Sequence, residues 1–229
     1  MTESIFIVGD VHGKFKQLLN KLPTQNNSPV EIICVGDLGI GFHPSQEMEQ
    51  SQLKVLNGLF KARNITFYSI RGNHDDPDYF RGSTRVELSN LVLLDDYTTL
   101  EFGGKKLLLV GGAVSIDRLV RIENIDYWKD EGFILDESKI SECDILITHS
   151  APAWIGPCSE NDIKYWTSRD PTLWEECVAE RRAHNKLTRL AKPSRLYAGH
   201  FHGFYNVEHE GCNARILDEL EIVECRLNL

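Results

Sequence analysis

The chain has 229 residues, a formal net charge of −9 and a sequence pI near 5.4. This length fits one domain, and we expect residues 1–229 to form it. The acidic balance argues against binding of extended nucleic acid, because proteins that grip the phosphate backbone are usually basic or carry a basic stripe. No run approaches the roughly 18–20 apolar residues of a membrane span. The first residues also lack a basic leader, so we expect a cytoplasmic protein without membrane contact.

Short apolar runs bounded by turn residues predict most of the strands. We expect strands at 4–8, 31–35, 66–70, 91–94, 99–102, 106–110, 144–148, 195–198, 204–209, 214–217 and 221–226. Gly103-Gly104 predicts one hairpin turn and Gly211 another.

Three stretches have the charge content and apolar spacing of amphipathic helices, at 14–21, 46–61 and 172–190. The last carries the local basic cluster of the chain, which we expect to be a solvated helix face: Arg181, Arg182, His184, Lys186 and Arg189. Strands that alternate with helices and then give way to hairpins predict an α/β protein with mixed sheets. Residues 113–142 and 152–172 fit neither pattern and are candidate substrate-covering loops.

The six cysteines are scattered, with no C-x-x-C pair. This usage favours a reducing compartment and buried free thiols over a disulfide framework or a thiolate zinc site.

Polar clusters follow five of the predicted strands directly. They are Gly9-Asp10-Val11-His12-Gly13, Gly36-Asp37-Leu38-Gly39, Arg71-Gly72-Asn73-His74-Asp75, Thr148-His149-Ser150 and Gly199-His200-Phe201-His202-Gly203. Ligands of open α/β sheets bind beyond the carboxyl ends of the strands, so these clusters can converge on one spot. Each cluster alone is weak evidence, since Gly-Asp is a common turn, but their joint occurrence predicts a site.

Aspartate, asparagine and histidine form a mixed oxygen and nitrogen ligand set, which suits Mn, Fe, Zn, Co or Ni. Asp10 and His12 lie two positions apart, as do His200 and His202, which places both side chains of a pair on one side of an extended chain. The candidate ligands exceed what one ion takes and are about right for two: Asp10, His12, Asp37, Asn73, His149, His200 and His202.

The ordered set of motifs resembles the calcineurin-like metallophosphoesterases, from Asp10 to His202. The resemblance implies a four-layer α/β/β/α sandwich with two mixed sheets and a centre of two divalent metal ions, with Mn²⁺ favoured. It implies one metal held by Asp10, His12, Asp37 and His202, and the other by Asp37, Asn73, His149 and His200. Asp37 then bridges the two ions, and His74 is the catalytic histidine.

The second motif departs from the Ser/Thr protein phosphatase branch of that family. That branch continues Gly-Asp-x-x-Asp-Arg-Gly, whereas this chain has Gly36-Asp37-Leu38-Gly39-Ile40-Gly41-Phe42. The Asp and Arg that orient the histidine and hold phosphate are missing. Asp75 in place of the usual Glu, and the run Thr148-His-Ser-Ala-Pro152, resemble bacterial and phage-type members instead.

These residues predict hydrolysis of phosphomonoesters or phosphodiesters, including nucleotides, by a hydroxide shared between two metals. His74 is the expected proton donor to the leaving group. Asp75 either orients His74 or caps the turn. Asn73, Arg71 and Arg118 are candidate substrate-binding residues, although either arginine could instead pair with a carboxylate.

Three alternative functions remain open at this stage: a Ser/Thr-type protein phosphatase, a nuclease, and a catalytically silent binding scaffold. The sequence does not specify the oligomeric state.

Overall fold

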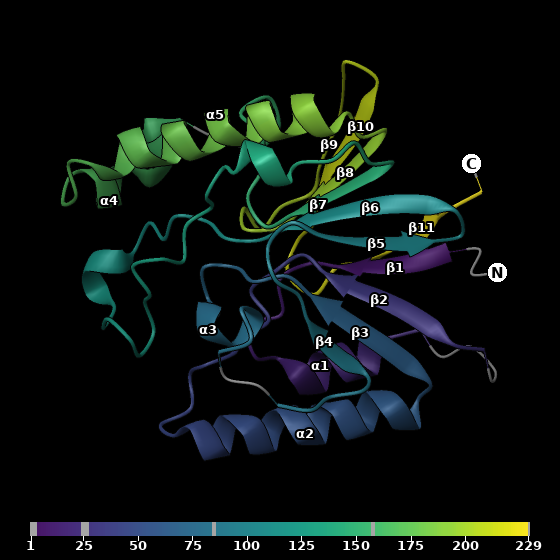
Figure 1. The fold of residues 1–229 in the computed structure, drawn as a ribbon. Coiled ribbons are helices and arrows are strands. Elements are labelled where there is room, and N and C mark those ends of the chain that lie inside the picture. The colour runs from purple at the N-terminus through teal and green to yellow at the C-terminus, as the bar shows by residue number, and fades with distance from the viewer. Residues whose placement is uncertain (1–3, 24–27, 84–85, 157–158, 229) are drawn as a thin grey trace.

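The computed structural model describes residues 4–23, 28–83, 86–156 and 159–228. The chain forms four layers, with helix α5 above a six-stranded sheet and helices α1 and α2 below a five-stranded sheet (Figure 1). This is the α/β/β/α arrangement with two mixed sheets that the motifs predict.

The five-stranded sheet has the order β11-β1-β2-β3-β4. Strands β1 to β4 run parallel, and β11, near the end of the chain, pairs antiparallel with β1. The strands are β1 (Ser4–Val8), β2 (Val30–Cys34), β3 (Ile65–Ser69), β4 (Leu91–Leu93) and β11 (Ile222–Arg226). The carboxyl ends of β1, β2 and β3 therefore meet at one edge.

The six-stranded sheet has the order β5-β6-β7-β8-β10-β9. Its four central strands β6, β7, β8 and β10 are parallel, and an antiparallel hairpin strand lies at each edge. The strands are β5 (Thr98–Phe102), β6 (Lys105–Val110), β7 (Ile145–Thr148), β8 (Arg195–Ala198), β9 (Tyr205–His209) and β10 (Cys212–Ile216). The expected glycines close both hairpins, with positive φ at Gly103, Gly104 and Gly211.

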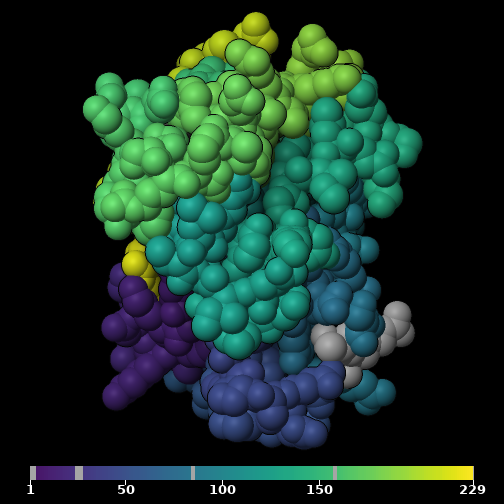
Figure 2. Space-filling view, turned by 90° about the vertical axis from the view of Figure 1, so that its left-hand side faces the viewer, coloured from purple at the N-terminus to yellow at the C-terminus, as the bar shows by residue number. Residues whose placement is uncertain are grey.

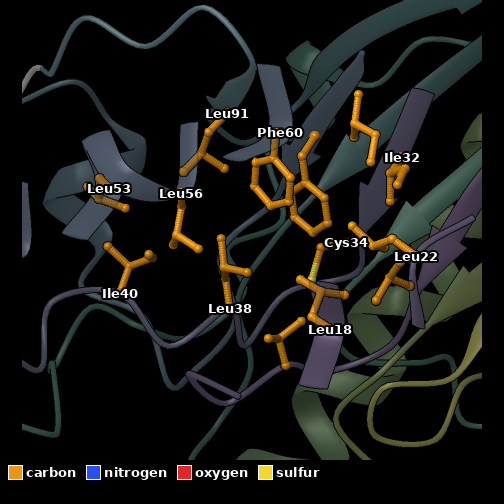
Figure 3. Close-up of a cluster of buried hydrophobic side chains, with 14 of the residues drawn as sticks. Leu18, Leu22, Ile32, Cys34, Leu38, Ile40, Leu53, Leu56, Phe60 and Leu91 are labelled. Carbon is orange, nitrogen blue, oxygen red and sulfur yellow. The ribbon is translucent and has the colours of Figure 1, made fainter. Parts of the chain in front are cut away.

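Successive side chains of a strand point to opposite sides, so the apolar residues of one strand contribute to the cores on both faces of its sheet. In β1, Ile5 and Ile7 face the other sheet and pack in a fully buried cluster with Leu107 and Ile145. Val8 of the same strand packs with the helices beneath the sheet. Figure 3 shows this lower cluster, which includes Leu18, Ile32, Cys34, Leu53, Leu56, Phe60 and Leu91.

Helix α1 (Phe15–Lys21) and helix α2 (Gln46–Ala62) cover the lower sheet. Ser45 caps α2, since its side chain accepts a hydrogen bond from the backbone nitrogen of Met48. Helix α2 buries one stripe of apolar side chains, at Leu53, Leu56 and Phe60. This stripe anchors the helix to the sheet.

Helix α5 (Leu173–Ala191) covers the upper sheet and ends at Lys192, which has a left-handed φ of 50° before Pro193. The expectation of a wholly solvated basic face is wrong for two members of the cluster. Arg181 and His184 are 3% and 1% exposed because they point toward the body of the protein. Arg182 and Arg189 are exposed, as expected.

The two candidate covering loops contain only short helices, namely 3₁₀ helices η1 (Arg118–Val120), η2 (Glu137–Lys139) and η3 (Glu160–Ile163), and α4 (Lys164–Thr167). A further short helix, α3 (Pro77–Phe80), follows β3. Figure 2 looks onto this side, where the teal segment after β6 covers the middle of the face, between α5 above and the lower helices. Within the described ranges, no helix is both long and apolar enough to cross a bilayer.

Candidate metal centre

The seven candidate ligands all lie in loops that follow strands. Asp10 and His12 follow β1, Asp37 follows β2, Asn73 follows β3, His149 follows β7, and His200 and His202 follow β8. Three of these strands belong to the lower sheet and two to the upper one. The centre therefore lies where the carboxyl ends of two facing sheets meet.

Asp10, His12, Asp37 and His202 form the first group, and their ligand atoms all lie within 4.8 Å of one another. The Nε2 atoms of His12 and His202 are 3.0 Å apart. His202 Nε2 is 2.9 Å from Asp10 Oδ2, and His12 Nε2 is 3.7 Å from Asp37 Oδ2. Two carboxylates and two imidazoles converging in this way form a donor set suited to a divalent transition metal.

The second group is centred on Asn73 Oδ1, which lies 3.0 Å from His149 Nε2 and 2.9 Å from His200 Nδ1. Asp37 Oδ1 is 3.2 Å from the same His149 nitrogen. The two oxygens of Asp37 thus face different groups, Oδ2 toward His12 and Oδ1 toward His149. This carboxylate lies between the two groups of ligand atoms.

The charge balance of the centre fits a cation. Asp10 and Asp37 are 0% and 1% exposed, and Asp10 Oδ1 has no hydrogen-bond partner within the described chain. Burial lowers the pKa of His149, but the carboxylates of Asp37 and Asp10 outweigh it and raise that pKa to about 10. Buried carboxylates need a positive partner, whether a proton on an imidazole or a metal ion.

Backbone conformation at the centre is constrained. His12, Asp37, His200 and His202 have positive φ values of 48°, 49°, 66° and 43°. Such values are uncommon for residues with side chains and concentrate at functional sites. A Cβ atom on Gly199 would lie 2.0 Å from Asp10 Oδ1, so only glycine lets the β8 loop approach that carboxylate.

Contacts behind the ligands hold them in orientation. The Nδ1 atom of His149 lies 2.9 Å from the backbone oxygen of Val35, which leaves Nε2 to face the centre. The amide nitrogen of Asn73 donates to Ser115 Oγ at 3.0 Å, which turns Asn73 Oδ1 toward the histidines. The backbone nitrogen of Ser115 donates in turn to the buried carboxylate of Glu131. Support of this kind fixes ligand geometry.

His74 lies beside the ligands, and its backbone nitrogen donates to Asp37 Oδ1 at 2.7 Å. Its Nε2 atom lies 2.5 Å from Nη2 of Arg121. Burial and, to a smaller degree, the Arg121 charge lower the pKa of His74 to about 4, against the opposing effect of Asp37. The neutral imidazole therefore accepts a hydrogen bond from the Arg121 guanidinium, because a guanidinium can only donate.

Asp75 makes contacts of the turn-capping kind. Its carboxylate accepts hydrogen bonds from the backbone nitrogens of Leu38, Gly39, Ile40 and Gly72 at 2.8–3.2 Å, and the residue is 0% exposed. No described contact joins it to the His74 ring. Of the two roles that the sequence left open, these contacts fit capping of the turn rather than orientation of His74. They also join the loop of the second motif to that of the third.

Arg71 is placed differently from the expected substrate-binding position. Its side chain is buried, donates to Asp96 Oδ2 at 2.8 and 3.1 Å, and also bonds to the carbonyls of Glu131 and Gly132. These bonds occupy the planar fork of the guanidinium. Arg71 therefore acts within the fold, tying the β3 loop to the segment that follows β6.

Arg118 is also committed to carboxylates. Its guanidinium bonds to Asp170 Oδ2 at 2.7 Å and to Glu176 Oε1 at 2.9 Å. The salt-bridge alternative fits this residue, which clamps η1 to the start of α5. The neighbouring Arg121, to which the sequence assigned no definite role, is the arginine that reaches the centre.

A cleft of about 400 Å³ opens over the centre. The ligands Asp37, Asn73, His200 and His202 line it together with His74 and Arg121. The remaining walls come from Ile116 and Asp117 in the first covering loop, Ile163 and Trp166 in the second, and Phe201. Sequence reasoning did not single out the two isoleucines, because an isolated apolar residue in a loop carries no signal of its function.

The fold and the centre define a two-sheet α/β/β/α protein with a candidate metal site at the carboxyl ends of its strands. The family model of the calcineurin-like phosphoesterases matches residues 4–204, and the chain therefore belongs to this family. No curated protein matches the sequence significantly.

Solved structures align with this chain at low sequence identity. One crystal structure aligns with a TM-score of 0.60 and 11% identity over 99% of this chain and 96% of that chain. The crystal structure of TT1561 of Thermus thermophilus aligns with a TM-score of 0.49 and 9% identity over 97% and 99%. Vacuolar Protein Sorting 29 from Cryptosporidium parvum aligns with 0.33 and 15% over 98% and 87%.

Proposed function

We propose that this protein is a dinuclear metal-dependent phosphoesterase that hydrolyses small phosphomonoesters or phosphodiesters. The observation that carries the proposal is the position of Asp37, whose two carboxylate oxygens face two separate groups of ligand atoms. A single ion needs no such arrangement, whereas two ions that share a carboxylate do. Mn²⁺ is the first candidate metal, and Fe, Zn, Ni and Co fit the same donors.

Two divalent ions in such a site lower the pKa of bound water and neutralise charge on a phosphate. Asp10, His12, Asp37 and His202 would hold one ion, and Asp37, Asn73, His149 and His200 the other. The buried carboxylates and the orphaned Asp10 Oδ1 support this assignment. The chain itself then has to bind the phosphoester, orient it and protonate the leaving oxygen.

His74 is the candidate proton donor, because it lines the cleft beside the ligands. Its Nε2 atom accepts a hydrogen bond from Arg121 in this structure and so carries no proton, and donation from Nε2 requires that contact to open and Nε2 to take up a proton first. An entering phosphate offers Arg121 a stronger, charge-assisted partner than a neutral imidazole. Substrate binding and release of His74 are thus coupled through one guanidinium.

The test is a panel of aryl phosphates, bis-aryl phosphates, cyclic nucleotides and a phosphopeptide, assayed with each divalent metal after chelation. We expect turnover of the small esters that chelation abolishes and one transition metal restores. Turnover of the phosphopeptide alone would favour a protein phosphatase instead. Protein that binds no metal and cleaves no ester would contradict the proposal.

A further inference from the structure

A small side pocket opens off the metal cleft. Its volume is about 90 Å³. It shares four lining residues with the cleft, namely Ile116, Ile163, His200 and Phe201. A molecule that places its phosphate at the metal ligands can therefore extend a neighbouring group into this pocket.

The walls of the side pocket are mainly apolar. Val114 and Ile116 come from the loop after β6, Ile163 from the end of η3, Cys177 from α5, and Phe201 from the loop between the two β8 ligands. These side chains converge from segments far apart in the sequence. The pocket is thus a product of the two covering loops closing against α5.

Two polar residues at the pocket, Arg181 and Glu180, have other roles or surroundings than contact with a ligand. Arg181 bonds within the fold, and Glu180 is buried in an apolar region. The Arg181 guanidinium donates to the carbonyls of Pro152 and Ile155 and lies 4.9 Å from the centre of the Phe201 ring. It therefore holds the second covering loop and supports Phe201. Burial raises the pKa of Glu180 to about 7, which reflects the low polarity of this region.

We propose that the side pocket binds the apolar group of the alcohol that leaves from phosphorus, so that the substrate is a phosphoester of a compact apolar or single-ring alcohol. This inference rests on the proposed function, because it takes the metal ligands as the phosphate site. Apolar contact within a few ångströms of the reacting phosphorus fixes the ester orientation as well as adding affinity.

The volume of the pocket sets a size limit. An enclosed apolar cavity of roughly 150 Å³ holds one benzene ring, and this pocket is smaller but open to the cleft on one side. A branched alkyl group or one aromatic ring fits with part of its surface in the cleft. A fused double ring does not fit.

The experiment measures calorimetric binding of methylphosphonate, phenylphosphonate and 1-naphthylphosphonate to the manganese-loaded protein. Phenylphosphonate should bind roughly 10- to 100-fold more tightly than methylphosphonate, since that is the effect of burying one apolar side-chain equivalent. The naphthyl compound should bind more weakly than the phenyl compound, because a fused double ring does not fit the pocket. Cys177→Trp, which fills the side pocket from α5 at a residue that does not line the cleft, should abolish the phenyl preference and leave methylphosphonate binding unchanged.

Ile125→Trp is the matched control, because Ile125 is 56% exposed in the same covering loop as Ile116 and lines neither cavity. It should keep the phenyl preference. Phe201→Ala enlarges the pocket and should let the naphthyl compound bind at least as well as the phenyl compound, which provides a second test if Cys177→Trp fails to fold.

Equal binding of methyl and phenyl compounds by the native protein, or a phenyl preference that survives Cys177→Trp, would overturn the inference. Absence of binding by every phosphonate would overturn it as well. The readout is binding, so its failure is distinguishable from failure of the proposed function. Hydrolysis of small esters without a phenyl preference in binding would contradict the proposed role of the side pocket and leave the proposed function standing. A phenyl preference without hydrolysis of any ester would contradict the proposed function instead.

Discussion

The Nη2 atom of Arg121 lies 2.5 Å from the Nε2 atom of His74, inside the cleft that the candidate metal ligands line. Arg121 is held there by Asp117, 2.7 Å away, and its side chain is only 8% exposed. One charged donor therefore occupies the nitrogen that would have to take up a proton before passing it to the leaving group. The first two predictions concern this pair.

Replacing Arg121 by Gln should lower kcat/KM for a phosphoester by roughly 10- to 100-fold, since hydrogen bonds to charged groups contribute about 1.5–3 kcal/mol. Arg121→Lys should restore part of the loss, because it keeps the charge without the planar fork. Steady-state kinetics provide the measurement. Arg189→Gln, on the exposed face of α5, is the control, and unchanged kinetics in Arg121→Gln would remove Arg121 from substrate binding.

His74→Asn should lower kcat by roughly 10²- to 10⁴-fold, the usual contribution of general acid catalysis, while metal content stays that of the native protein. The loss should be larger for an alkyl phosphate than for 4-nitrophenyl phosphate, because a good leaving group needs no proton. Parallel kinetics and metal analysis test both statements. Equal losses for the two esters would show that His74 does not protonate the leaving oxygen.

Asp37→Asn should lower the occupancy of both metal positions, because the two oxygens of Asp37 face the two groups of ligands. His12→Asn should weaken only the first position. Equilibrium dialysis followed by elemental analysis counts bound ions per chain. If Asp37→Asn and His12→Asn lost the same number of ions, the shared role of Asp37 would be wrong.

Asp75→Ala should destabilise the fold by about 3 kcal/mol or more, since it leaves three buried backbone donors and one half-buried donor without their acceptor. Urea unfolding, followed by circular dichroism, measures the change. Asp130→Ala is the comparison, because its exposed carboxylate pairs only with Arg81 across the surface. A small effect of Asp75→Ala together with a large loss of activity would restore the alternative role of Asp75 beside His74.

His184 predicts a pH dependence of stability. Burial is the main cause that lowers its pKa from 6.5 to about 3, and its ring nitrogens have no hydrogen-bond partner among the described residues. Between those two pH values the unfolded chain binds a proton that the folded chain does not. The free energy of unfolding should therefore fall with falling pH by about 1.4 kcal/mol per unit from this group.

His184→Leu should remove that part of the pH dependence. The difference between the native protein and the variant isolates His184 from Glu180, whose raised pKa acts in the opposite sense: its contribution is complete below pH 4.5 and is lost as pH rises through about 7. Unfolding free energies at a series of pH values provide the test. Parallel curves for the two proteins would show that His184 does not titrate as its burial predicts.

The sequence predicted the elements of the fold closely, because the period of the apolar runs is a local property. Strands β1 and β8 have the predicted bounds, and most of the others shift by one residue, with β10 starting two residues earlier. Helices α3 and α4 were missed, since four residues are too few to show a periodic pattern. Pro77 at the start of α3 and the Asp76 cap are the signals that could have revealed it.

The sequence by itself determined the candidate metal ligands, because a carboxylate or an imidazole next to a glycine directly after a strand is a local pattern. The seven candidate ligands named from this pattern converge in the structure. The roles of the arginines were decided only by the tertiary structure. Arg71, Arg118 and Arg121 all lie in loops and look equivalent in the sequence. Each pairs with a carboxylate, but of the three Arg121 is the one that also reaches His74. A long side chain takes its role from the partner that the fold brings within its reach, and that partner comes from a distant part of the chain.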